Sequence, residues 1–193
     1  MLGCANLRPV ARYPYVEASD LTLERELLEL IVARRDVVAE ADFEFLGDAR
    51  RGRIITFPIA PPRGPATEFV TTIGTGDSAR RVRAARARAG ALPSGDATEH
   101  YDIEIPEDAR RRGGLRLRVR YRQPGIGAFA YTLKTGAYWK GPIGELSVVA
   151  RDPDALLLRA TVEDRPPDTR PSGQWRWRFE NLEPSAGVLL VLR

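Results

Sequence analysis

The sequence predicts an all-β fold, an antiparallel β-sandwich made of one or two packed immunoglobulin-like sandwiches. Three observations lead to this prediction. Several segments alternate apolar and charged residues with the period of two that a strand with one buried side requires. Turn-forming residues separate these segments, and the 193 residues include 17 glycines and 15 prolines. Many short strands joined by such turns are typical of sandwiches.

Three segments carry the alternation most clearly. Val37–Phe45 places apolar residues on one face and three acids on the other, and Leu115–Arg122 repeats the pattern with arginines on its polar face. Gln174–Glu180 does the same with two tryptophans and a phenylalanine on its apolar face. Shorter strands are expected at Arg53–Ile59, Glu68–Ile73, Tyr101–Ile105, Phe129–Leu133, Glu145–Ala150, Leu156–Val162 and Gly187–Leu192.

Two segments are ambiguous. Leu21–Arg35 follows Ser19-Asp20 and has apolar residues at 23, 27, 28 and 31, so periodicity alone favours a helix over an edge strand. Ser78–Ala91 is rich in arginine and alanine, which are strong helix formers, and predicts a helical insertion. Because it has few apolar residues to bury, we interpret this insertion as a solvated connection between strands.

The composition bounds the chemistry. The chain has one cysteine and one histidine, so it cannot form an intramolecular disulfide or a Cys/His zinc site. With 43% hydrophobic and 29% charged residues it is globular, and no apolar run reaches the ~18–20 residues of a membrane span. It has no phosphate-binding loop, dinucleotide fingerprint or nucleophile elbow. We expect no metal and no cofactor.

The remaining candidate chemical groups are isolated ones. His100 lies at the start of an expected strand without a nominated serine or acid, which favours a packing role. Asp152 and Asp154 flank a proline, a pattern more typical of a hairpin turn than of a calcium site. Carboxylate pairs for glycoside hydrolysis depend on spatial separation, so the sequence nominates none.

Opposite charges are concentrated in two stretches. Glu17–Asp48 has ten acids and three arginines, a net charge of −7, and Ala49–Gln123 has sixteen arginines and eight acids, a net charge of +8. We expect the two stretches to face each other. The clearest surface feature is an arginine ladder in the second stretch, which either binds a polyanion or pairs with the acids of Val37–Phe45; we favour pairing. The ladder consists of Arg116, Arg118, Arg120 and Arg122.

The N-terminus suggests a cellular location. Leu2-Gly3-Cys4 resembles the end of a bacterial lipobox, although the basic and apolar segments of a signal peptide do not precede it. Cys4 is therefore a candidate for lipidation, which would attach the protein to a membrane surface; the alternative is a free thiol. We expect residues 1–18 to be a tail or lipoprotein linker and residues 19–193 to be the β-sandwich region, with 19–123 and 126–193 as an alternative subdivision.

The densest motif reads as strand, tight loop and strand, with Tyr138 and Trp139 at the loop. Its pattern, Tyr-x-Leu-x-Thr-Gly and then Trp-x-Gly-Pro-Ile, resembles that of a group of uncharacterised bacterial secreted proteins. Phe179–Pro184 resembles the closing segment of that group, and Leu23–Val32 resembles its early strand. The motif residues are Tyr131, Leu133, Thr135, Gly136, Trp139, Gly141, Pro142 and Ile143.

The resemblance implies an extracytoplasmic all-β protein with a signal or lipoprotein leader and no established activity. It also favours a strand over a helix at Leu21–Arg35. The function we expect is a non-enzymatic module of the cell envelope that binds a protein or a surface polymer, with Tyr138, Trp139 and Lys140 as contact residues. The alternatives are a carboxylate-dependent hydrolase of envelope glycans and a polyanion-binding module that uses the arginine ladder. We do not expect nucleic acid as a partner, and we expect membrane contact only through an acylated Cys4.

Overall fold

The computed structural model describes residues 21–49, 54–59, 65–74, 78–86, 90–91, 97–110, 113–133 and 140–193, and within them it confirms the all-β, sandwich-like fold. A turn of 3₁₀-helix lies at Glu107–Ala109. The strands are β1 (Leu21–Val32), β2 (Asp36–Gly47), β3 (Ile54–Ile59), β4 (Thr67–Ile73), β5 (Arg80–Val82), β6 (Ala84–Arg86), β7 (Gly90–Ala91), β8 (Ala97–Glu104), β9 (Leu115–Pro124), β10 (Ala128–Tyr131), β11 (Ile143–Arg151), β12 (Leu157–Val162), β13 (Gln174–Leu182) and β14 (Val188–Leu192).

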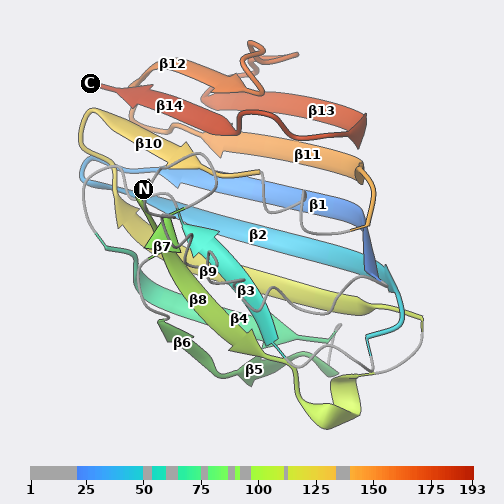
Figure 1. Ribbon diagram of the computed structural model, residues 1–193. Helices are drawn as coiled ribbons and strands as arrows, with labels where there is room; N and C mark the ends of the chain where they lie inside the picture. The colour runs from blue at the N-terminus through green and yellow to red at the C-terminus, as the bar shows by residue number, and fades with distance from the viewer. Residues whose placement is uncertain are drawn as a thin grey trace, which may run out of the picture.

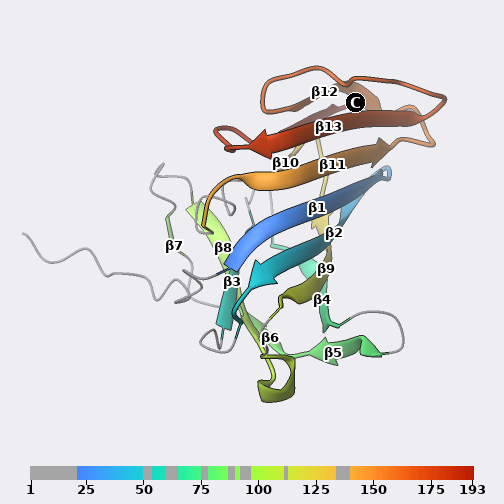
Figure 2. The ribbon, with the colours of Figure 1, turned by 90° about the vertical axis from the view of Figure 1, so that its right-hand side faces the viewer.

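The strands form one large sheet and two small ones. The large sheet has seven strands in the order β13-β11-β1-β2-β9-β4-β5. A three-stranded sheet, β10-β14-β12, lies near the β13 end of the large sheet (Figure 1). A four-stranded sheet, in the order β3-β8-β6 with β7 also paired to β8, lies near its β4 end (Figure 1). Viewed from the side, β3 and β8 lie on one side of the large sheet, which leaves its opposite face uncovered by them (Figure 2).

The large sheet combines both ends of the sequence. β1 pairs with β2 in antiparallel register and with β11 in parallel register, as between Leu28 and Val148. The other named pairs are antiparallel, including β11 with β13. β9, which ends at Pro124, and β11, which begins at Ile143, therefore belong to one sheet.

A single apolar core fills the space between the sheets. Its large members come from all three sheets: Tyr121 and Trp177 from the large sheet, Phe129 from the three-stranded sheet, and Phe57 and Ile103 from the four-stranded sheet. All five are buried. The alternating residues that the sequence assigns to one face of each strand are the ones that pack here, which is why the strand prediction was successful.

A β-bulge explains the ambiguous pattern of the first strand. The register between β1 and β2 shifts between Leu23 and Arg25. Before the bulge Leu21 and Leu23 point inward, and after it Glu26 and Leu28 do, because the extra residue turns the following side chains to the other face. Leu27 and Ile31 are apolar although they lie on the outward face, and together with Leu23 and Leu28 they imitate a helical period. The preference for a helix from periodicity alone was wrong, and the strand favoured by the resemblance is confirmed.

The helical alternative for Ser78–Ala91 is also wrong in the part that the structure describes. This part forms the short strands β5, β6 and β7. β5 pairs with β4, whereas β6 and β7 pair with β8. Pairing with neighbouring strands has therefore outweighed the helix propensity of alanine and arginine.

The outer edge of β13 is covered by the chain that precedes it. Thr169 and Arg176 form an isolated bridge in which each N–H bonds the carbonyl of the other, at 3.4 and 3.1 Å. The carboxylate of Asp168 accepts the backbone N–H of Arg178 at 2.8 Å. Polar backbone groups on this edge are thereby satisfied within the chain, as is usual for edge strands that avoid pairing with other molecules.

Candidate functional site

The arginine ladder lies on the outer face of the large sheet and is paired with the acids of the neighbouring strand. β9 lies between β2 and β4, and three of its four ladder arginines stand directly opposite outward acids of β2, whereas Arg122 stands opposite Val38 and reaches Asp36. This arrangement confirms the predicted pairing of the two charged stretches. The pairs are Arg116 with Glu44 at 3.0 Å, Arg118 with Asp42 at 2.7 Å, Arg120 with Glu40 at 2.8 Å and Arg122 with Asp36 at 2.8 Å.

The ion pairs shift the pKa values of Glu44 and Arg118 toward the charged forms. A hydrogen bond from Arg116 and the nearby charge of Arg25 hold the pKa of Glu44 below its ordinary value. The hydrogen bond and charge of Asp42 raise the pKa of Arg118 in turn. A polyanion would have to compete with carboxylates that are already in place, so this geometry favours a structural role for the ladder.

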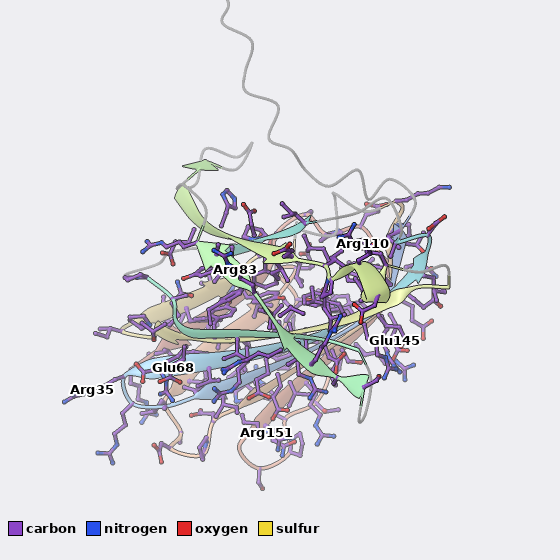
Figure 3. All side chains as sticks on the ribbon, turned by 90° about the horizontal axis from the view of Figure 1, so that it is seen from below. Arg35, Glu68, Arg83, Arg110, Glu145 and Arg151 are labelled. Carbon is purple, nitrogen blue, oxygen red and sulfur yellow. The ribbon has the colours of Figure 1, made fainter. Side chains whose placement is uncertain are left out.

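The other two outer faces differ from each other in charge. Arg83 and Arg110 lie on the side of the four-stranded sheet, away from Arg151 on the outer face of the large sheet (Figure 3). A surface depression there is lined by Arg83 and Arg110 together with Asp102 and Glu104, so it carries both signs of charge. The three-stranded sheet is different.

The outer face of the three-stranded sheet is apolar on β10 and β14 and mixed on β12. The register places Ala128, Val191 and Arg159 in one cross-strand row and Ala130, Leu189 and Thr161 in the next. Leu189 is 45% exposed, and Leu158, in the bulge of β12, is 56% exposed. These two rows contain no acid. We call Ala128, Ala130, Leu158, Leu189 and Val191 the apolar face.

The inner face of the same sheet is also apolar and packs against the core. Phe129, Leu190 and Ala160 form the inward row, and all three are buried. The sheet is thus apolar on both sides, whereas a strand with one solvated side normally alternates apolar and polar residues. Contiguous exposed apolar side chains of this kind often mark interaction sites.

The predicted contact residues are only partly described. Tyr138 and Trp139 lie outside the described residues, and so does Cys4. Lys140 is exposed, and its backbone N–H donates to the carbonyl of Leu21 at 3.1 Å, which fixes the entry to β11 beside the start of β1. The sequence analysis did not single out the apolar face. The signal for it was Val188–Leu192, five consecutive apolar residues in one strand.

Glutamates gather at one open depression, which bears on the hydrolase alternative. The depression lies on the outer face of the large sheet and is lined by Glu24, Glu44, Glu145 and Glu180. Glu44 is bonded to Arg25 and Arg116, and Arg178 lies 3.3 Å from Glu145 and 3.8 Å from Glu180. A general acid needs a raised pKa, and the neighbouring arginines act in the opposite direction on Glu44.

Acids that could have formed a cation site bind backbone groups instead. The two carboxylate oxygens of Asp152 accept the N–H groups of Leu156 and Leu157 at 2.7 and 2.9 Å, which confirms the turn predicted from its sequence context. Glu163 accepts the N–H groups of Ser185 and Ala186 through one oxygen. Within the described ranges, no group of three or more His, Cys, Asp or Glu residues is arranged to hold a metal ion.

Two glutamates are buried in the interior. Glu99 on β8 pairs with Arg86 and accepts the backbone N–H of Ala66 at 2.8 Å. Glu26 on β1 is fully buried and accepts a hydrogen bond from the hydroxyl of Tyr131 at 2.9 Å. Burial raises the pKa of Glu26 to about 7, although the hydrogen bond from Tyr131 partly opposes this shift.

His100 is buried in β8 opposite Pro58, in agreement with the expected packing role. Its burial lowers its pKa, and the charge of Asp102 opposes that shift.

In the part of the chain that is described, no helix is long and apolar enough to cross a membrane.

Comparisons with known proteins identify the fold. No protein-family model matches the sequence, and no curated protein is similar to it in sequence. Solved structures of leukotriene A4 hydrolase from Saccharomyces cerevisiae share the fold, with TM-scores of 0.51 and 0.52 and sequence identities of 13% and 9%. The structure of the yeast enzyme in complex with bestatin gives a TM-score of 0.50 at 12% identity. These matches cover 96–98% of this chain but only 32–33% of the hydrolase, so the chain spans about a third of that enzyme's length.

Proposed function

We propose that this chain is a non-enzymatic β-module that docks onto a larger protein through the apolar face of its three-stranded sheet. The observation that carries the proposal is that this sheet presents apolar side chains on both sides, one to the core and one to solvent. Burial of exposed apolar area is the main favourable term in protein association. The same fold makes up a third of a longer hydrolase, which supports a role beside a larger unit.

The charges around the apolar face define the chemistry of the partner. Arg159 lies in one of its rows, and Arg193 follows β14. Neither forms an ion pair with an acid among the described residues, whereas the ladder arginines are each paired. We therefore propose a partner with an apolar surface bordered by carboxylates, because complementary charges orient association and raise its rate.

The proposal favours this face over an edge of the large sheet. The edge of β13 is capped by Asp168 and Thr169, so it offers few free backbone groups for an added strand. On the outer face of the large sheet, ion pairs join β2 to β9, and docking there would have to desolvate them.

Site-specific photo-crosslinking in cells that express the native protein tests the docking. A photoreactive residue at Leu189 should capture one protein larger than this chain. The matched control is Leu27 on the outer face of the large sheet, because it is also a leucine and is 46% exposed, against 45% for Leu189. Replacing Val191 by Asp should reduce the adduct from position 189 at least tenfold, and Arg159→Glu should reduce it if carboxylates border the partner.

Three results would contradict the proposal. Equal capture from positions 27 and 189 would mean that the adducts are non-specific. A crosslink of the chain to a second copy of itself would identify a homodimer instead of a larger partner. Capture of a protein that is unaffected by Val191→Asp would remove the apolar face from the interaction.

We also propose that the module works outside the cytoplasm and is attached to the bacterial envelope through an acylated Cys4. The lipobox-like Leu2-Gly3-Cys4 and the resemblance to secreted proteins support this part of the proposal. Metabolic labelling of the full gene product with an alkyne-bearing fatty acid should mark the native protein, and Cys4→Ser should abolish the label. A labelled Cys4→Ser protein, or a native protein without label that fractionates with the cytoplasm, would contradict it.

A further inference from the structure

The strongest remaining feature is the buried carboxyl group at the point where the three sheets meet. Glu26 belongs to the large sheet, and its hydrogen-bond donor Tyr131 belongs to β10 of the three-stranded sheet. The ring of Tyr131 contacts Phe57 of the four-stranded sheet, with 6.3 Å between ring centroids. Phe57 also contacts Tyr121 of β9, at 6.2 Å. We call Glu26, Phe57, Tyr121 and Tyr131 the junction.

The bulge in β1 is what puts an acid into this position. Without the extra residue at Glu24–Arg25, continued alternation from Leu23 would place Arg25 inward and Glu26 outward. With it, Glu26 points into the core between Phe43 of β2 and Leu146 of β11, which are its partners in register. An acid in the core is costly unless it is paired or neutral, so the position calls for an explanation.

No cation compensates the carboxylate within the described part of the chain. The groups that act on Glu26 are Tyr131 from β10, through its hydroxyl, and burial itself. Tyr121 faces it from β9, and the negative charge of Glu26 helps to raise the pKa of that tyrosine. Its neighbours from β2 and β11 are apolar. One carboxyl oxygen, Oε2, is buried without a hydrogen-bond partner.

We propose that Glu26 is a proton-controlled latch of the junction: the neutral acid holds the three-stranded sheet against the large sheet, and its ionisation loosens the three-stranded sheet. Ionisation puts an unpaired charge between apolar side chains, and the structure relieves it by opening toward water. The strands that move carry the apolar face, so docking weakens when the latch opens. This last consequence rests on the proposed function, but the latch itself does not.

Hydrogen exchange on the isolated protein tests the latch without a partner. Backbone exchange of β10 and β14 is measured between pH 5.5 and 8.5 and corrected for the chemical exchange rate. If Glu26 has a pKa near 7 in the closed form and an ordinary value in the open form, protection of these strands should fall about 30-fold over this range. Protection of β2 and β9 in the large sheet should change much less.

Three variants identify the group responsible. Glu26→Gln keeps the shape and removes the charge, so it should abolish the pH dependence in β10 and β14. Glu99→Gln is the matched control, because it changes the other interior glutamate, which is paired with Arg86, and it should leave the dependence unchanged. Tyr131→Phe removes the donor to the carboxylate and should move the midpoint of the transition to higher pH.

A direct titration keeps the test decisive if Glu26→Gln fails to fold. Carbon-13 NMR of the side-chain carboxyl of Glu26 in the native protein should give the same midpoint as the loss of protection. A midpoint near the ordinary glutamate value, protection of β10 and β14 that is independent of pH, or an unchanged pH dependence in Glu26→Gln would each overturn the latch. If the latch holds and position 189 captures no partner, the docking proposal alone has failed.

Discussion

The outer faces of the large sheet and of the three-stranded sheet differ in how their side chains are satisfied. On the large sheet each arginine of the ladder has an acid on the neighbouring strand within hydrogen-bonding distance, so the face is complete without another molecule. On the three-stranded sheet the two outward rows contain alanine, valine and leucine on β10 and β14, with Arg159 and Thr161 on β12 and no acid. The outer face of the large sheet is therefore satisfied by ion pairs within the chain, whereas the outer face of the three-stranded sheet leaves apolar side chains exposed.

The largest effect that would sharpen the comparison comes from two adjacent leucines of β14. Leu190 is fully buried in the core and Leu189 is 45% exposed on the apolar face. Leu190→Ala should lower the free energy of unfolding by about 2–5 kcal/mol, because it removes buried methyl groups and leaves a cavity. Leu189→Ala should cost less than about 1 kcal/mol.

Urea denaturation of the isolated protein measures both values. A similar loss for the two variants would mean that Leu189 packs against its own chain. The apolar face would then serve folding, and the contrast between the two outer faces would disappear.

The second effect contrasts Glu44, which is ion-paired on the outer face of the large sheet, with Glu26, which is buried on the inner face without a cation among the described residues. Glu26 has a raised pKa in the folded protein, so its stabilising contribution is complete below its ordinary value of 4.5 and is lost as the pH rises to about 7. A shift of this size corresponds to about 3 kcal/mol. Glu26→Gln should therefore become more stable than the native protein by up to this amount above pH 7, and the gain should vanish near pH 4.

Glu44 should respond to pH in the opposite direction. Its pKa is lowered, so its contribution is present at neutral pH and is lost as the pH falls through its folded-state pKa. Denaturation curves of Glu26→Gln and Glu44→Gln between pH 3.5 and 8.5, each compared with the native protein, separate the two signs. Parallel curves for both variants would contradict the contrast between the faces.

The smallest effect concerns single pairs of the ladder. A double-mutant cycle of Arg118→Ala and Asp42→Ala should give a coupling of about 0.2–1 kcal/mol at low salt, because the pair is exposed. The coupling should shrink in 1 M salt, where charges are screened over about 3 Å. A coupling that is zero at every salt concentration would show that this pair does not stabilise the fold.

The strands could be predicted because most of them bury one side. In Val37–Phe45 and Leu115–Arg122 the alternation gave the strand, the buried face and the charge of the exposed face, and the opposite charges indicated that the two strands face each other. The same alternation could not be recognised in Leu21–Val32, because the bulge in this strand changes which residues point inward. The parallel pairing of β1 with β11 could not be predicted, because it joins segments more than a hundred residues apart and has no local signal.

The candidate surfaces could be predicted only in part. The ladder was visible because charge alternates with apolar residues along one strand. The apolar face was not, because Val188–Leu192 is apolar throughout and such a run shows neither where the strand's two faces are nor which one is exposed. The role of Glu26 required the structure, since the acid reaches the junction through the bulge and its donor Tyr131 is 105 residues away in sequence.

The parallel pairing of β1 with β11 also has a consequence for how the chain matures. A ribosome delivers β1 and β2 early, but the strand that completes the other side of β1 emerges only with Ile143–Arg151. Until then the twelve-residue strand β1 has an open flank. Contacts of such long sequence separation form slowly. We expect this sheet to remain incomplete during synthesis until Arg151 has left the ribosome, a state in which chaperones can still engage the chain.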